Sequence, residues 1–63
     1  MRIVIEFDTD KNAAFEDDRY AEVNRILNNA NKRIMQCLDD GNGIRVPIKD
    51  INKNRVGILE IVM

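Results

Sequence analysis

Histidine and serine are absent from this 63-residue sequence, and cysteine and threonine each occur once. A single cysteine excludes a disulfide within the chain. Without histidine, a metal site held by imidazole and thiolate groups is not expected either. A hydroxyl nucleophile beside a base is also missing, because Thr9 is the only serine or threonine. We therefore expect a protein that is not an enzyme and that has no catalytic, cofactor-binding or metal-binding residues.

A strong charge of one sign is lacking as well. Ten Lys and Arg residues nearly balance eleven Asp and Glu residues, which leaves a net charge of −1. Proteins that bind nucleic acid by neutralising phosphates normally carry a basic excess, so direct nucleic-acid binding is not expected. No basic segment precedes an apolar run of signal-peptide or membrane-span length. We expect no membrane contact and a location in the cytoplasm, where an unpaired cysteine stays reduced.

The short chain limits the core that it can bury. Its 63 residues predict a single domain, residues 1–63, which buries only about 60% of the surface that its unfolded form exposes. Because disulfides and metals are not expected, close packing or a partner subunit must supply the remaining stability. A homodimer is therefore kept as a candidate state.

Three segments have the two-residue period of half-buried strands, namely residues 1–8, 44–49 and 55–63. Pro47 lacks an amide hydrogen, which predicts that the second strand lies at an edge of the sheet. The asparagines of residues 50–54 predict a hairpin turn, since asparagine tolerates left-handed geometry. The third strand has a long apolar run, so we expect it in the centre, antiparallel to the first. The side chains expected to face inward are Ile3, Ile5, Phe7, Ile44, Val46, Ile48, Leu59 and Ile61.

Between the first two strands, apolar residues recur at steps of three and four, which predicts a helix that ends near Leu38. Asp17 or Asp18 is the expected N-cap, because a short carboxylate accepts from the free amides of the first turn. Gly41 is the expected left-handed residue at the other end. The predicted inward stripe contains Tyr20, Val23, Leu27, Ala30, Ile34, Cys37 and Leu38, with Ile26 at its edge.

These elements predict an α+β fold of order β-α-β-β, in which one long helix packs on a three-stranded, mainly antiparallel sheet. On the outer face of the sheet, Val4, Ile58 and Val62 are expected to form a modest apolar patch, with Val56 beside them. Such a patch often marks an interface. A scatter of exposed aliphatic side chains explains the same pattern equally well.

Three segments of the sequence resemble a group of short uncharacterised phage and prophage proteins: "IEFDTDKNAAFEDD", "EVNRIL" and "DINKNRVGILEI". The resemblance covers nearly the whole chain. This sequence departs from the group in the insertion of Lys11 and in a longer, asparagine-rich helix end. The matching positions are Asn12, Ala13, Ala14, Phe15, Glu16, Asp17, Glu22, Val23, Ile26, Leu27, Asp50, Ile51, Asn52, Asn54, Val56 and Gly57.

The resemblance implies an origin, and the origin implies a class of function. Small non-enzymatic phage proteins often inhibit host defence, so an anti-CRISPR-like inhibitor of a host nuclease complex is the leading hypothesis. It would act in the cytoplasm of a bacterial host through protein–protein contact. The candidate contact residues at the acidic start of the helix are Glu16, Asp17, Asp18 and Glu22.

Two alternatives belong to other classes. The first is a homodimeric structural or assembly accessory protein that uses the outer sheet face. The second is a sponge for a small nucleotide signal, held between subunits by basic side chains. The candidates for that basic pocket are Arg2, Arg45 and Lys49.

Overall fold

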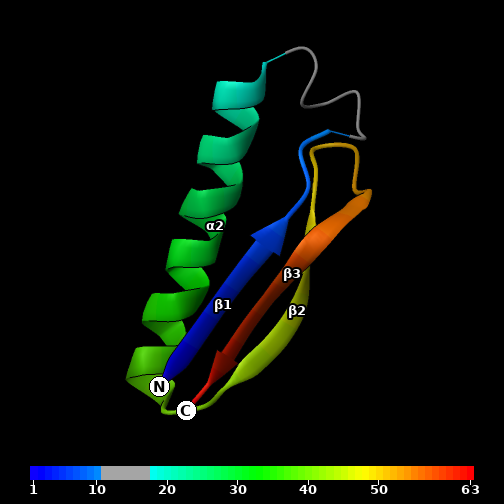
Figure 1. Ribbon diagram of the computed structural model, residues 1–63. Coiled ribbons are helices and arrows are strands. Elements are labelled where there is room, and N and C mark those ends of the chain that lie inside the picture. Colours follow the sequence, from blue (N-terminus) through cyan, green and yellow to red (C-terminus); the bar gives the residue numbers. More distant parts are fainter. Residues whose placement is uncertain (11–17) are drawn as a thin grey trace.

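The computed structural model describes residues 1–10 and 18–63. These residues form four elements: strand β1 (Arg2–Phe7), helix α2 (Arg19–Asp40), strand β2 (Ile44–Lys49) and strand β3 (Arg55–Val62). The helix lies on one face of a three-stranded antiparallel sheet (Figure 1). The predicted α+β fold is confirmed.

Strand β3 is the central strand, as predicted, in a sheet of order β1-β3-β2. It pairs antiparallel with both neighbours. Leu59 and Ile61 point from β3 into the core and are its most deeply buried side chains. Pro47 lies in β2, at an edge of the sheet, which confirms the expected position of the proline-containing strand.

Gly57 is required by the close approach of β1 to β3. A Cβ atom at this position would collide with the carbonyl oxygen of Glu6 and would lie 2.6 Å from the Cβ of Phe7. Real Cβ atoms do not approach other atoms so closely, so a larger residue here would push the two strands apart.

Both ends of α2 follow the sequence. Asp18 is the N-cap, and its Oδ1 accepts from the backbone N–H of Ala21 at 3.0 Å. Gly41 adopts φ 74° in the left-handed region, and its N–H donates to the carbonyl of Cys37 at 2.8 Å. These local signals fix the length of the helix but not its rotation about its own axis.

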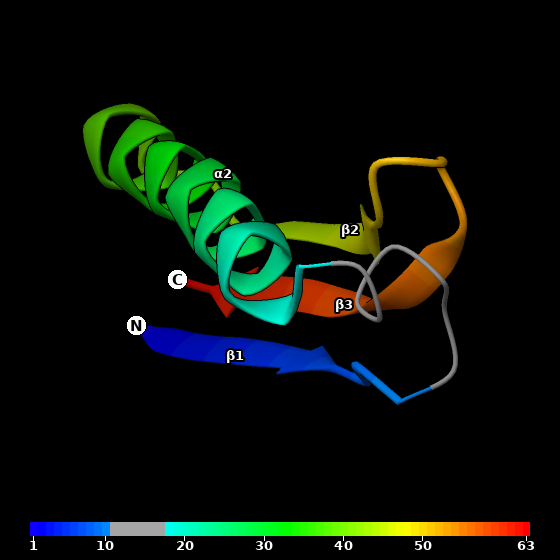
Figure 2. The ribbon, with the colours of Figure 1, turned by 90° about the horizontal axis from the view of Figure 1, so that it is seen from above.

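The predicted inward face of α2 is partly wrong. Ile26, expected at the edge, is 3% exposed, whereas Leu27 is 44% and Tyr20 is 91% exposed. The helix packs mainly against β2 and β3, and β1 is the strand farthest from it (Figure 2). Because its apolar residues cover a wider arc than these two strands can bury, one flank of the arc stays outside. The core consists of Ile26, Ala30, Cys37, Ile48, Val56, Leu59 and Ile61.

Val56 is the second correction, because it belongs to the core and not to the outer face of the sheet. Ile48 pairs with Gly57 and Lys49 pairs with Arg55, so Val56 has no opposite residue on β2. Such an extra residue is a β-bulge, which breaks the strict alternation of faces. The two-residue period could not place Val56 for this reason.

Candidate binding groove

Of the four acidic residues predicted at the helix start, the structure describes Asp18, which is exposed, and Glu22, which is buried. The carboxylate of Asp18 caps the helix. Glu22, although it is among the predicted contact residues, is only 6% exposed. Glu16 and Asp17 lie outside the described residues.

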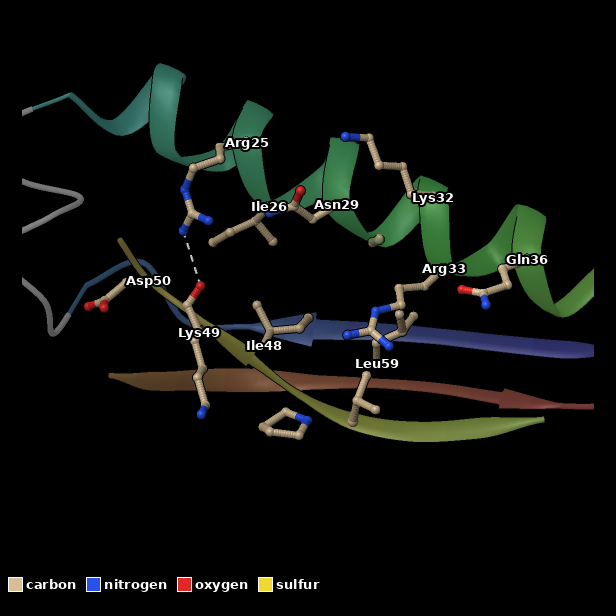
Figure 3. Close-up of a pocket in the computed structure, with 13 residues that line it drawn as sticks. Arg25, Ile26, Asn29, Lys32, Arg33, Gln36, Ile48, Lys49, Asp50 and Leu59 are labelled. Carbon is tan, nitrogen blue, oxygen red and sulfur yellow. Dashed lines mark hydrogen bonds between the residues drawn. The ribbon is translucent and has the colours of Figure 1, made fainter. Parts of the chain in front are cut away.

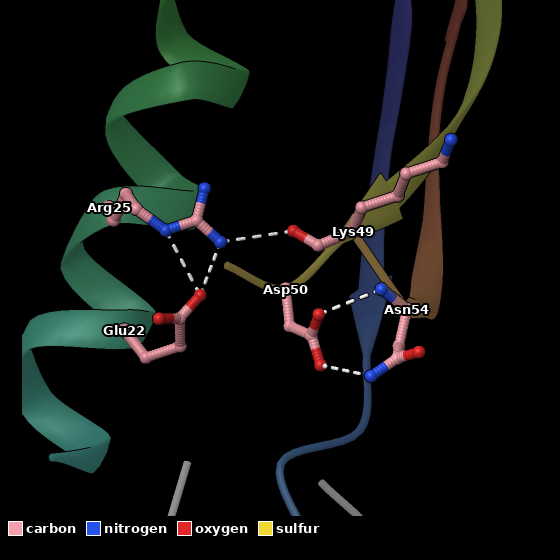
Figure 4. Close-up of polar contacts among 5 residues, drawn as sticks. All are labelled: Glu22, Arg25, Lys49, Asp50 and Asn54. Carbon is pink, nitrogen blue, oxygen red and sulfur yellow. Dashed lines mark hydrogen bonds and ion pairs between the residues drawn. The ribbon is translucent and has the colours of Figure 1, made fainter. Parts of the chain in front are cut away.

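Glu22 is buried because a cation neutralises it. Arg25, one turn further along α2, donates from Nε to Oε1 of Glu22 at 3.0 Å, and its Nη2 pairs with the same oxygen. The same Nη2 donates to the backbone carbonyl of Lys49 at 3.1 Å (Figure 4). One guanidinium therefore satisfies a buried carboxylate and ties α2 to the end of β2.

A second buried carboxylate holds the turn that follows β2. Asp50 accepts from the backbone N–H of Asn54 at 2.8 Å and from its Nδ2 at 3.3 Å (Figure 4). The backbone N–H of Lys53 donates to the Asp50 carbonyl at 3.0 Å. Lys53 takes the left-handed conformation, at φ 67°, where the sequence suggested an asparagine. The turn itself was predicted, but its organising residue, Asp50, was not.

An open groove runs between α2 and β2, with Arg25 and Asp50 at one end (Figure 3). Its helix wall is a polar row at helical spacing, which comes from the flank of α2 on the β2 side. Its floor is the apolar core under the helix. The residues that line it are Arg25, Ile26, Asn29, Ala30, Lys32, Arg33, Gln36, Val46, Pro47, Ile48, Lys49, Asp50 and Leu59.

The groove has a positive rim. Within residues 1–10 and 18–63, ion pairs join Arg25 to Glu22 and Arg45 to Glu60, and neither involves Lys32 or Arg33. Among the described residues of the lining, Asp50 is the one carboxylate, and both of its oxygens already accept hydrogen bonds. Figure 3 shows the guanidinium of Arg33 reaching from α2 toward the strands, whereas the ammonium of Lys32 points away from the strands and that of Lys49 points away from the helix.

The groove can therefore recognise carboxylates. Arg33 supplies a planar donor fork and Lys32 a second positive charge. Asn29 and Gln36 add amide groups along the same wall. The helical spacing of these residues can be read from the sequence. The groove cannot, because it forms only where β2 lies beside this flank of α2.

The outer sheet face holds the remaining predicted contact residues. Val62 is exposed there, and Val4 and Ile58 are half-buried. Val4 lies opposite Glu60, which pairs with Arg45 on the other neighbouring strand at 3.5 Å. An ion pair thus crosses the predicted apolar patch and divides it.

The cations named for a nucleotide pocket are separated in the single chain. Arg2 is on β1, whereas Arg45 and Lys49 are on β2, the opposite edge of the sheet. Arg45 is engaged by Glu60. One copy of the chain therefore does not bring the three side chains together.

Comparison of the chain with protein-family models finds no matching family, and searches of curated proteins and of solved structures also find no match. In the described part of the chain, no helix combines the length and hydrophobicity of a membrane span. Nor do residues 1–10 and 18–63 contain a cluster of three or more thiol or carboxylate side chains placed to share a metal ion.

Proposed function

We propose that this protein is a non-enzymatic binding protein, and that the groove between α2 and β2 receives an acidic segment of a partner protein. The observation that carries the proposal is the positive rim of Lys32 and Arg33, which no carboxylate of the described residues pairs with. Opposite charge across an interface sets its register and speeds association. A carboxylate from the partner would form ion pairs with these cations.

The lining of the groove favours a protein over a nucleotide. Among the described residues, the groove wall and floor include no aromatic side chain, and stacking on aromatic rings is a main source of affinity for nucleobases. Apolar side chains such as Val46 and Pro47 beside the cations suit the mixed surface of a polypeptide. The nucleotide-sponge hypothesis is therefore the weaker proposal for this surface.

The partner that we propose is a bacterial host protein, with a defence nuclease complex as the leading candidate. The resemblance to short phage and prophage proteins supports this choice, and the cytoplasm of the host is the corresponding location. An inhibitor needs a rigid surface more than a reactive one. The Arg25 and Asp50 contacts make the surface rigid, because they fix one end of the groove.

Paired charge reversals test the proposal. The tagged protein is used to capture partners from bacterial lysate at two salt concentrations, with mass spectrometry as the readout. Lys32→Glu with Arg33→Glu changes the groove, and Arg19→Glu with Lys53→Glu makes the same change of charge outside its lining. We expect the groove pair to lose the captured protein and the control pair to keep it. Equal capture by both variants would contradict the proposal, as would equal loss.

A further inference from the structure

Strand β1 has an open edge. Within the described residues it pairs with β3 alone. Asp8 donates its N–H to the carbonyl of Val56 at 3.0 Å, so the even-numbered residues of β1 direct their backbone groups to β3. The backbone N–H and C=O groups of Ile3 and Ile5 therefore point to the open edge. Such an edge is ready to pair with another strand.

The sequence of this edge is complementary to itself. When Arg2 to Glu6 is laid antiparallel to a second copy about Val4, each Arg2 lies opposite a Glu6. Ile3 lies opposite Ile5, and Val4 lies opposite Val4. Opposite charges directly across an antiparallel pair stabilise it, as do paired β-branched residues. A shift by two residues in either direction would place Glu6 or Arg2 opposite Val4 and lose this match.

We propose that two copies of this chain associate through β1, antiparallel, with Val4 on the two-fold axis. The pairing joins the two sheets into one of six strands. In this register Ile3 and Ile5 of the two copies exchange the hydrogen bonds of the open edge. Arg2 and Glu6 form two ion pairs on the outer face of the sheet.

The apolar surface that the single chain leaves open lies on the same side. Ile3 and Ile5 pair with Ile61 and Leu59, so they share the helix-covered face of the sheet, yet both remain exposed. The flank of α2 that carries the exposed Leu27 and Tyr20 is opposite the flank that lines the groove beside β2. In the dimer the isoleucines occupy the centre of the sheet, and the two helix flanks face each other above the seam.

The groove lies at the β2 side of the sheet, away from the seam. Dimerisation would therefore leave both grooves open.

Reciprocal charge exchange tests the interface, with molar mass from sedimentation equilibrium as the readout. We expect the unmodified chain to have twice the mass of 7.3 kDa. Arg2→Glu alone, or Glu6→Arg alone, places like charges opposite each other twice and should raise the dissociation constant about tenfold or more. The combination of both changes restores the pairs and should restore the dimer. Lys53→Glu, in the turn, is the control that should change nothing.

Cysteine at the two-fold axis gives a second test that does not depend on charge. Facing residues in a non-hydrogen-bonded pair have Cα atoms about 4.5 Å apart, within the range of a disulfide. Val4→Cys should therefore form a covalent dimer with oxidised glutathione. Glu6→Cys is the matched control, since its two copies would be about 14 Å apart at 3.4 Å per residue. The unmodified chain, whose Cys37 is buried, shows how much covalent dimer forms without an introduced cysteine.

The outcomes separate this inference from the proposed function. A monomeric mass at every concentration would overturn the dimer, and so would equal effects of the single and combined charge exchanges. The Lys32→Glu, Arg33→Glu pair should leave the mass unchanged while it removes partner capture. If the chain is a dimer but captures no partner protein, the groove proposal fails and the dimer proposal stands. If a monomeric chain captures a partner protein, the dimer proposal fails and the groove proposal stands.

Discussion

At the scale of single residues, two carboxylates have roles that their sequence context does not reveal. Glu22 sits among helix residues whose pattern indicates a solvent-facing position, yet it is buried beside Arg25. Asp50 follows a strand like any turn residue, yet both of its oxygens accept from Asn54. Burial of a carboxylate requires partners, and both partners are close in sequence, Arg25 for Glu22 and Asn54 for Asp50. The burial itself depends on tertiary packing, which the local sequence pattern does not show.

The Glu22 contact makes a direct prediction about stability. Glu22→Gln removes the charge that Arg25 neutralises, in a site where the glutamate side chain is 7% exposed. Because the arginine is 35% exposed and retains water, we expect a loss of about 1–2 kcal/mol in the free energy of unfolding. Urea titration followed by circular dichroism measures it.

Glu60→Gln is the matched control for that measurement. Its partner Arg45 is largely exposed and 3.5 Å away, so its loss should change the free energy of unfolding by less than about 0.5 kcal/mol. Equal effects of the two substitutions would show that the Glu22 pair is no more important than a surface contact.

At the scale of elements, local signals in the sequence come close to the boundaries, although α2 continues past Leu38 to Asp40. The alternation of residues 1–8, the Asp18 cap and Gly41 each act within one element, and each prediction is confirmed. The rotation of α2 depends instead on which strands it covers. Its apolar arc is too wide to define one face, so the sequence could not choose between Ile26 and Leu27. The Val56 bulge is unpredictable for a related reason, because it depends on the register with β2.

Neighbouring alanine substitutions test the rotation of the helix. Ile26→Ala empties a buried site and should cost about 2–5 kcal/mol in the free energy of unfolding. Leu27→Ala removes a half-exposed side chain from a helix that tolerates alanine well, so the cost should stay below about 1 kcal/mol. Thermal unfolding of both variants gives the comparison. A larger loss for Leu27→Ala would restore the inward face that the sequence alone suggested.

At the scale of the whole molecule, the two edges of the sheet differ in chemistry. The β1 edge combines isoleucines with one arginine and one glutamate and is complementary to itself, which fits a second copy of the chain. The β2 edge forms, with α2, a groove whose cations fit an acidic partner. A small domain gains a large combined surface when its edges serve different partners, and a dimer with two grooves would bind a repeated or dimeric target with higher avidity.

Acetylation of lysines in the captured complex tests the groove most directly. The rate at Lys32, on the groove wall, is compared with the rate at Lys53 in the turn, before and after the partner binds. Binding in the groove predicts that acetylation slows at Lys32 and is unchanged at Lys53. An unchanged rate at Lys32 in the complex, or slowing at Lys53 alone, would contradict the assignment of this groove as the binding surface.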